Sequence, residues 1–234
     1  MSHHMHDHHR DVQGGNIRAA VFGASDGLVS NTLLILGVAG ADIASSTVRV
    51  TGFVGLLAGA VSMAAGEYVS MQAQNELVEA EIKREREAHA NEPEHEIEEL
   101  AELYVERGLD PEQAASIARS LMSNPDIALE VHTREELGVS PDDLASPMGA
   151  ASSSFVAFSI GAILPLVPWF FAGGTAAVIA SVAIALTSAA LIGAILATQT
   201  GRSIVRTAAR QVAIAAGAAL ASYFIGKLLG VQVS

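Results

Sequence analysis

Carboxylates and imidazoles recur at helical spacing in the middle of this chain. Steps of three and four place them on one face of each of two predicted helices: Glu81, Glu85, His89 and Glu92, then Glu96, Glu99, Glu102 and Glu106. His132 and Glu136, four residues apart, can also point to one place. Carboxylate oxygen and imidazole nitrogen are ligands of divalent transition metals, and like charges at this density repel unless a cation lies among them.

We therefore predict a metal-binding region. Its candidate ligands are Glu81, Glu85, His89, Glu96, Glu99, Glu102, His132 and Glu136. The alternative is a solvated acidic face, which is what runs of charge usually form.

The acidic residues are concentrated in one segment. Residues 73–147 hold 20 of the 25 Asp and Glu residues and 6 of the 13 Lys and Arg residues, a net charge of −14, while the rest of the chain carries +2. A carboxylate-rich domain between apolar segments favours the capture of a hard or borderline cation.

A second group of candidate residues lies within apolar stretches. Asp26 is nine residues into a predicted membrane span, about 14 Å deep at 1.5 Å per residue. A carboxylate there is costly and marks a functional site, unless it makes a helix-packing hydrogen bond. Met63, Glu67 and Met71 form a stripe at steps of four, which is either packing or a thioether–carboxylate path for a metal. We predict a translocation pathway through Asp26, Met63, Glu67 and Met71.

The elements that must position these residues are helices. The 234 residues are 50% hydrophobic with mean hydropathy +0.39. Five stretches are long enough to supply the roughly 20 residues that cross a bilayer: 17–41, 48–71, 149–172, 175–198 and 208–230. We predict an all-α polytopic membrane protein with five transmembrane helices and a cytosolic helical metal-binding domain inserted between spans 2 and 3. The domains are a His-rich tail (1–16), spans 1–2 (17–72), the acidic domain (73–147) and spans 3–5 (148–234).

Basic residues in the short connections predict the orientation. Arg10 and Arg18 precede the first span, and Arg202, Arg206 and Arg210 lie between the fourth and fifth. We therefore expect the N-terminus and the acidic domain in the cytoplasm, and short loops with no presequence favour a prokaryotic plasma (inner) membrane. No basic stripe suggests nucleic acid as a partner, and the absence of cysteine excludes disulfides.

Helix boundaries within the acidic segment are marked by proline, glycine and capping residues. The second span is expected to continue as a charged helix to Asn91 and to end before Pro93, and the next helix to end at Gly108. We expect its glutamates opposite its apolar residues, which include Leu100. Asp110-Pro111 and Asn124-Pro125 then open two further helices.

The histidines of residues 3–9 are a separate feature. They could collect metal, and a tag remnant or a disordered tail are equal alternatives.

Several motifs resemble those of the vacuolar iron transporter family. They are Val-Phe-Gly-Ala-Ser-Asp-Gly-Leu-Val at 21–29, Gly-Ala-Val-Ser-Met-Ala-Ala-Gly-Glu-Tyr-Val-Ser at 59–70, Gly-Leu-Asp-Pro at 108–111, Glu-Leu-Gly at 136–138 and Ile-Leu-Pro-Leu-Val-Pro at 163–168. The resemblance covers 16–230. It implies a five-span homodimer with a path between protomers, which exports Fe²⁺, often also Mn²⁺, from the cytosol in exchange for protons.

The resemblance also implies roles for single residues. The intramembrane carboxylate of the family corresponds to Asp26 and the pathway methionine to Met63, whereas a glutamate of eukaryotic members corresponds to Gly55. The proton-coupled step would then depend on Asp26 and Glu67. The family's cytosolic ligands correspond to Glu85, Glu96, Glu99 and Glu136, with Ala88 in place of a further glutamate and His132 in place of a methionine.

We accordingly expect a transporter rather than an enzyme, with Fe²⁺ or Mn²⁺ as transported and domain-bound ion, not as cofactor. Its expected partners are divalent metals, protons, the bilayer and a second copy of the chain. One alternative is a membrane-anchored metal-dependent oxidase, but its two Glu-x-x-His pairs are missing, since Glu92 and His95 straddle Pro93. The other is a metal sensor without transport, which would need no polar path past Asp26.

Overall fold

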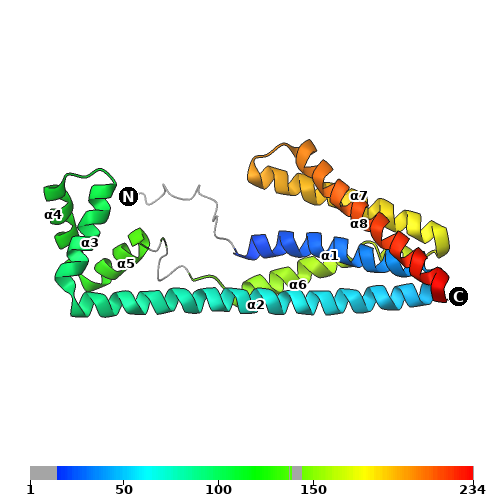
Figure 1. Cartoon of the computed structure of the whole chain (residues 1–234), viewed down its shortest axis with the longest axis horizontal. Coiled ribbons are helices and arrows are strands. Elements are labelled where there is room, and N and C mark those ends of the chain that lie inside the picture. Colours follow the sequence, from blue (N-terminus) through cyan, green and yellow to red (C-terminus); the bar gives the residue numbers. More distant parts are fainter. Residues whose placement is uncertain (1–14, 137, 139–143, 234) are drawn as a thin grey trace, which may run out of the picture. The chain divides into compact units, whose positions relative to one another are not determined.

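The computed structural model describes residues 15–136, 138 and 144–233, so nearly all of the predicted His-rich tail lies outside it. The described residues form α-helices and one 3₁₀ helix, with no strand among them, which confirms the all-α class (Figure 1). In chain order these are α1 (Gly15–Gly40), α2 (Ser45–Asn91), α3 (Pro93–Glu106), α4 (Pro111–Met122), α5 (Pro125–Glu136), α6 (Pro147–Ile163), the 3₁₀ helix η1 (Val167–Phe170), α7 (Gly174–Thr200) and α8 (Ile204–Val233).

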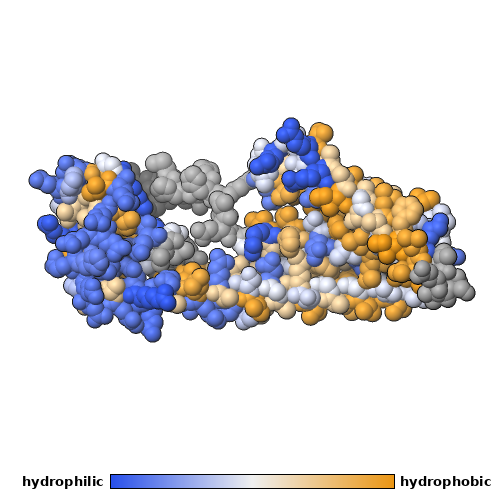
Figure 2. Space-filling model, viewed as in Figure 1, coloured by the Kyte–Doolittle hydropathy of each residue, from blue (hydrophilic) through white to orange (hydrophobic). Residues whose placement is uncertain are grey.

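The helices group into two compact units. The membrane unit, as we call it, comprises the chain up to Val69 and from Ser146 onward, and the acidic unit comprises Ser70–Ala145. Helix α2 is continuous and contributes to both. Hydrophobic residues dominate the surface of the helices of the membrane unit, and hydrophilic residues that of the acidic unit (Figure 2).

Within the part of the chain that the structure describes, four helices are long and apolar enough to cross a membrane. They are α1, α2, α7 and α8. The expected third span over 149–172 is not one helix, because α6 has 17 residues and ends at Ile163 before η1 begins. The coarse prediction of an all-helical protein with several membrane helices therefore holds, and the count of five spans stays a prediction.

The break after α6 has a local cause, and hydrogen bonds from other helices stabilise it. Pro165 has no backbone N–H, and it frees carbonyl groups at the end of the helix. Asn31 Nδ2 of α1 donates to the Ala162 carbonyl at 2.6 Å, and Ser181 Oγ of α7 donates to the Pro165 carbonyl at 2.7 Å. Ser181 Oγ also accepts the Trp169 indole N–H at 3.0 Å. The break is therefore built into the core of the membrane unit.

Glycines allow the membrane helices to approach closely. A Cβ placed on Gly27 of α1 would lie 2.2 Å from the Phe158 carbonyl oxygen of α6. Gly226 of α8 is equally restricted, because its Cβ would overlap the Gly37 carbonyl of α1. Small residues at helix interfaces are what backbone-to-backbone packing in membranes requires.

In the acidic unit, the helix ends agree with the sequence signals. Helix α2 ends at Asn91, and Gly108, with φ +98°, follows α3. The Asp110 carboxylate caps α4 by accepting the Glu112 N–H at 3.0 Å, with Pro111 in the first turn. The predicted breaks are therefore confirmed, and they turn α3 and α5 back upon each other.

Candidate metal centre

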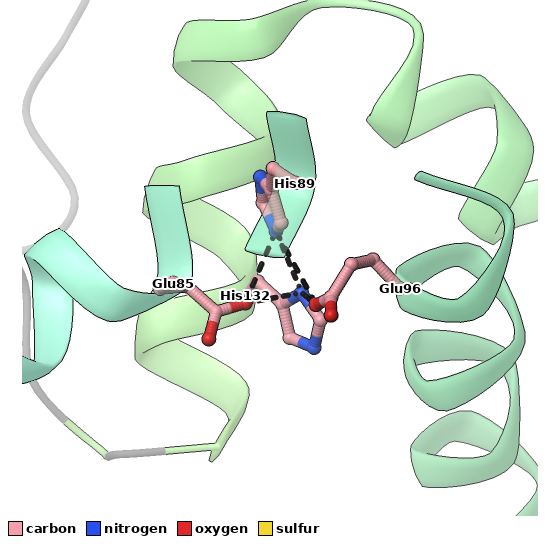
Figure 3. Close-up of side chains that lie close together, drawn as sticks. All are labelled: Glu85, His89, Glu96 and His132. Carbon is pink, nitrogen blue, oxygen red and sulfur yellow. Dashed lines mark hydrogen bonds and ion pairs between the residues drawn. The ribbon is translucent and has the colours of Figure 1, made fainter. Parts of the chain in front are cut away.

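Four potential ligands converge within the acidic unit: Glu85, His89, Glu96 and His132 (Figure 3). His132 Nδ1 lies 2.7 Å from Glu85 Oε1, 3.3 Å from Glu96 Oε2 and 2.9 Å from His89 Nε2. His89 Nε2 lies 3.1 Å from Glu85 Oε1 and 3.8 Å from Glu96 Oε2. Adjacent ligands bound at their usual distances to one metal ion would be roughly 2.8–3.6 Å apart. The four atoms all lie within 4.8 Å of one another, so small side-chain movements would let them bind a single ion.

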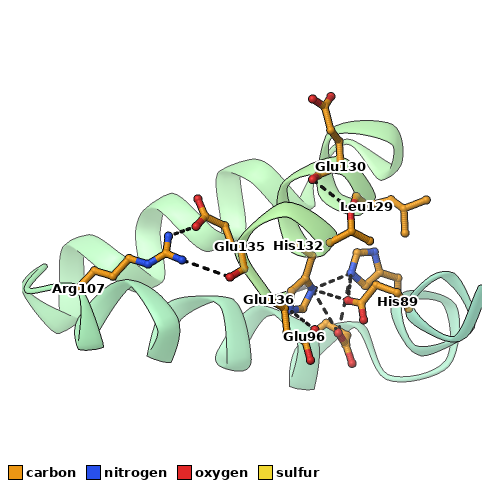
Figure 4. A network of polar contacts seen from close by, with 10 residues as sticks. His89, Glu96, Arg107, Leu129, Glu130, His132, Glu135 and Glu136 are labelled. Atoms are coloured by element: carbon orange, nitrogen blue, oxygen red, sulfur yellow. Dashed lines mark hydrogen bonds and ion pairs between the residues drawn. The ribbon is translucent and has the colours of Figure 1, made fainter. Parts of the chain in front are cut away.

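Three helices supply these side chains. Glu85 and His89 are one turn apart on α2, where the four-residue step places them on one face. The break at Pro93 starts a new helix and brings Glu96, in the first turn of α3, to the same place. His132 comes from α5, which is held to α3 by the ion pair of Arg107 with Glu135 (Figure 4).

Burial distinguishes this cluster from a solvated acidic face. His132 is fully buried and Glu96 is 5% exposed, whereas unpaired charged residues are rarely found inside proteins. Among the described residues, Glu85 Oε1 and His132 Nε2 have no hydrogen-bond partner. The rings of His89 and His132 stack with centroids 5.1 Å apart. Carboxylate oxygens and imidazole nitrogens thus face one another with too few hydrogen atoms to pair them all. A cation bound among these atoms would offset their mutual repulsion.

The environment also shifts the titration of the cluster. Burial, and then the charge of Glu136, raise the pKa of Glu85 above its usual value. Burial, and then the charge of Glu85, raise the pKa of Glu96 to about 7. Burial, and then the charge of His132, lower the pKa of His89, which keeps its imidazole neutral and able to bind a metal.

The other predicted ligands lie outside this group. Glu81 pairs with Arg84 at 2.6 Å, Glu99 is half-buried, and Glu102 is exposed. Glu136 Oε2 lies 4.0 Å from His132 Nε2 and its charge acts on Glu85, so Glu136 borders the cluster without being one of the four converging ligands (Figure 4).

One expectation about α3 is wrong for Glu96. The glutamates of α3 were expected opposite its apolar residues, and Glu102 and Glu106 are indeed exposed, but Glu96 and Leu100, one turn apart, are both buried on the same side. The reason is that this face of α3 packs within the unit.

The predicted pathway residues have different surroundings. Asp26 is on an exposed face of α1, and within the described residues its carboxylate makes no hydrogen bond or ion pair. Met63 packs against the core cluster that contains Phe158, Glu67 pairs with Arg18 at 3.4 Å, and Met71 is buried. Their role in translocation stays a prediction.

Two polar contacts in the membrane unit were not predicted from the sequence. Arg18, used only to orient the chain, lies against Glu67, and Asn31 closes the end of α6. A polar residue inside an apolar helix was the signal for Asn31. Nothing in the spacing of Arg18 and Glu67, 49 residues apart, could have indicated their contact.

The chain is similar to one protein family and to several named transporters. The sequence profile of the VIT family matches residues 17–227. The "Vacuolar iron transporter" of Acanthamoeba castellanii is 39% identical over 160 residues, which cover 68% of this chain but only 58% of that protein. "Vacuolar iron transporter 1" of Arabidopsis thaliana is 31% identical over 227 residues, covering 95% of this chain and 91% of the relative. The rice protein of the same name is 30% identical, covering 97% and 90%.

The match extends over both units, the apolar helices and the acidic segment alike. An apolar helical protein that is similar to named transporters over most of its length is a membrane protein by composition and by relationship. The chain therefore belongs to the VIT family and is an integral membrane protein.

Proposed function

We propose that the protein transports divalent iron, and also Mn²⁺, out of the cytosol in exchange for protons. The relatives it matches are named vacuolar iron transporters. The single observation that carries the proposal is the four-ligand cluster of the acidic unit, built into a chain with apolar helices long enough to cross a membrane. A metal-dependent oxidase or a sensor would not require the intramembrane Asp26.

The proposed topology has five membrane crossings, with residues 73–147 as a cytosolic domain between the second and third. Non-helical backbone at membrane depth is tolerated where it is buried in protein. Pro165 and Leu166 are fully buried and Trp169 is 2% exposed, which supports a third crossing made jointly by α6 and η1. Short connections such as that between α7 and α8 favour a prokaryotic plasma membrane.

In this proposal, the acidic domain collects the metal. The carboxylates of Glu85 and Glu96 converge with two imidazoles, so a divalent cation offsets the repulsion of the carboxylates and displaces protons from them. The ion is then released toward Glu67 and Met63 and reaches Asp26, where protonation from the opposite side of the membrane releases it.

The exposed position of Asp26 supports a homodimer. A carboxylate on the surface of a membrane helix would face lipid in a monomer, at a cost of several kcal/mol. A path between two protomers would instead give it water, protons and metal, and the exposed apolar residues of α1, such as Phe22, would be covered by the partner.

Flux measurements test this function. Purified protein is reconstituted in liposomes that contain a pH dye, and uptake of Fe²⁺, Mn²⁺, Zn²⁺ and Ca²⁺ is followed together with luminal pH. We expect Fe²⁺ and Mn²⁺ uptake coupled to proton movement in the opposite direction, and none of Ca²⁺. Metal binding without flux of any ion would favour the sensor and refute the transport function.

A further inference from the structure

The two imidazoles of the acidic unit differ from its carboxylates in the metals they favour. We infer that His89 and His132 act as specificity determinants, so that this unit takes up Fe²⁺ and the later divalent metals of the first transition row in preference to Mn²⁺, Mg²⁺ and Ca²⁺. This inference rests on the proposed function, since it assumes that the cluster receives the transported ion.

Half of the converging atoms are nitrogen. His89 Nε2 and His132 Nδ1 both point into the cluster and lie 2.9 Å apart, with one carboxylate oxygen from Glu85 and one from Glu96 (Figure 3). Imidazole suits iron, nickel, copper and zinc, while carboxylate, carbonyl and water suit magnesium, calcium and manganese. Ca²⁺ in particular takes six to eight oxygen ligands, and this set provides oxygen from two side chains.

The setting of His132 favours a ligand role over simple packing. The ring is fully buried, so it cannot turn outward to water. Its Nε2 has no hydrogen-bond partner among the described residues, and the nearest carboxylate on that side is Glu136, at 4.0 Å. A proton on Nε2 would face the Glu136 charge and leave the lone pair of Nδ1 directed at Glu85 Oε1 and Glu96 Oε2, 2.7 and 3.3 Å away. Lone pairs that face one another at these distances repel, and a shared cation removes the repulsion.

The other predicted carboxylate ligands are not among the four converging side chains. Glu81 pairs with Arg84, and Glu102 is exposed. Glu99 and Glu136 border the group, since their charges act on Glu85, but neither places an oxygen among the four converging atoms. The metal preference should therefore follow the nitrogen ligands.

Competing titrations of the full-length protein in detergent test the inference. In every sample the five histidines of residues 3–9 are changed to glutamine, so that the N-terminal segment does not bind the probes. Co²⁺ is titrated by its visible absorption and Mn²⁺ by the electron paramagnetic resonance of the free ion. The variants are His89→Gln, His132→Gln and His89→Glu, and the matched control is His95→Gln, because His95 is exposed on α3 outside the cluster.

We expect the parent protein to prefer Co²⁺, and His89→Gln and His132→Gln each to lower Co²⁺ affinity at least about 10-fold, since even outer partners of metal ligands contribute about 10–100-fold. Mn²⁺ affinity should change much less, and the Co²⁺ spectrum should shift. His89→Glu should still bind both metals but prefer Co²⁺ over Mn²⁺ by a smaller factor. His95→Gln should have the same affinities for both metals as the parent protein.

Equal parent affinities for Co²⁺ and Mn²⁺ would overturn the inference while leaving the transport function standing. An equal loss of both metals in the histidine variants would also overturn it, because the imidazoles would then be structural. A parent protein that binds neither metal would remove the cluster from the proposed function as well.

Discussion

The two units of the protein use buried polar groups in different ways. In the membrane unit the buried polar side chains are uncharged, and Asn31 and Ser181 donate to the backbone carbonyls of Ala162 and Pro165. Asn31 Oδ1 and Ser154 Oγ have no hydrogen-bond partner among the residues described. In the acidic unit, carboxylates and imidazoles face one another, and Glu85 Oε1 and His132 Nε2 likewise have no partner there. Among the described residues, the second arrangement alone brings four potential metal ligands together, and a cation would offset the repulsion of its carboxylates.

Asp26 fits neither pattern. It is exposed on α1 and, within the described chain, its carboxylate makes no hydrogen bond or ion pair. Under the proposed function, the metal-binding site lies within one unit, whereas the transport site at Asp26 needs a second copy of the chain.

The largest expected effect is on Asp26. Asp26→Asn keeps the shape and removes the charge, so we expect liposome flux to fall to the level of protein-free vesicles while metal binding by the acidic unit is unchanged. Asp26→Glu should retain partial flux. Wild-type flux in Asp26→Asn would show that the residue only packs, and the pathway would have to be abandoned.

Next in size is the loss of the carboxylate ligands. Glu85→Ala combined with Glu96→Ala should weaken Fe²⁺ or Mn²⁺ binding by about 100-fold or more, because two of four ligands are lost. Isothermal titration calorimetry of the full-length protein, with the N-terminal histidines replaced, measures this. The control is Glu102→Ala with Glu106→Ala, which removes two exposed charges from α3 and should bind as the parent does.

The pH dependence of the acidic unit provides a third test. The pKa of Glu96 is raised from 4.5 to about 7, so the folded state holds a proton that the unfolded state has lost between these values. Without metal, the raised pKa values of Glu96 and Glu85 should therefore make stability fall as the pH rises through this window. The lowered pKa of His89 acts in the opposite direction below its usual value of 6.5, and we expect the two carboxylates to outweigh it. Hydrogen exchange of α3 and α5, followed by mass spectrometry, should indicate easier opening at pH 7.5 than at pH 5.5 after correction for intrinsic exchange rates. Added metal should reverse the difference, and an unchanged pattern would count against a coupled cluster.

A smaller effect is expected at the break in the membrane unit. Ser181→Ala removes the donor to the Pro165 carbonyl and the acceptor of the Trp169 N–H, and should cost about 1–3 kcal/mol. Thermal unfolding in detergent, followed by the fluorescence of Trp169, measures this. Thr187→Ala on the exposed side of α7 is the control, since its hydroxyl only bonds the carbonyl four residues earlier. Equal melting temperatures for the two variants would refute the structural role of Ser181.

The smallest expected change concerns Arg18. Its guanidinium is largely exposed, so Arg18→Gln should alter stability by less than about 1 kcal/mol. If Glu67 lies on the metal path, freeing its carboxylate should lower the apparent KM of transport without changing the maximal rate. An unchanged KM would argue that Glu67 is not on the path.

Local signals in the sequence determined the helices of this protein. Pro93, Gly108 and Asp110-Pro111 end or begin helices where their backbone chemistry requires it, and the apolar runs identify the membrane helices. The stretch 149–172 is the exception. Its hydropathy alone suggested one helix, but Pro165 divides it because proline has no backbone N–H. Side chains of α1 and α7 then donate hydrogen bonds to the carbonyl groups left free at the break.

What only the tertiary structure decided is which of the 20 acidic residues in 73–147 meet. Helical periodicity specifies which residues share a face, but not what that face lies against. Periodicity grouped Glu81 with Glu85 and Glu96 with Glu102. The fold separated both pairs: Glu85 and the buried Glu96 lie in the cluster, whereas Glu81 pairs with Arg84 and Glu102 is exposed. The packing of α2, α3 and α5 selected two glutamates and two histidines, because a contact between distant segments depends on how their helices pack, and no single segment carries that information.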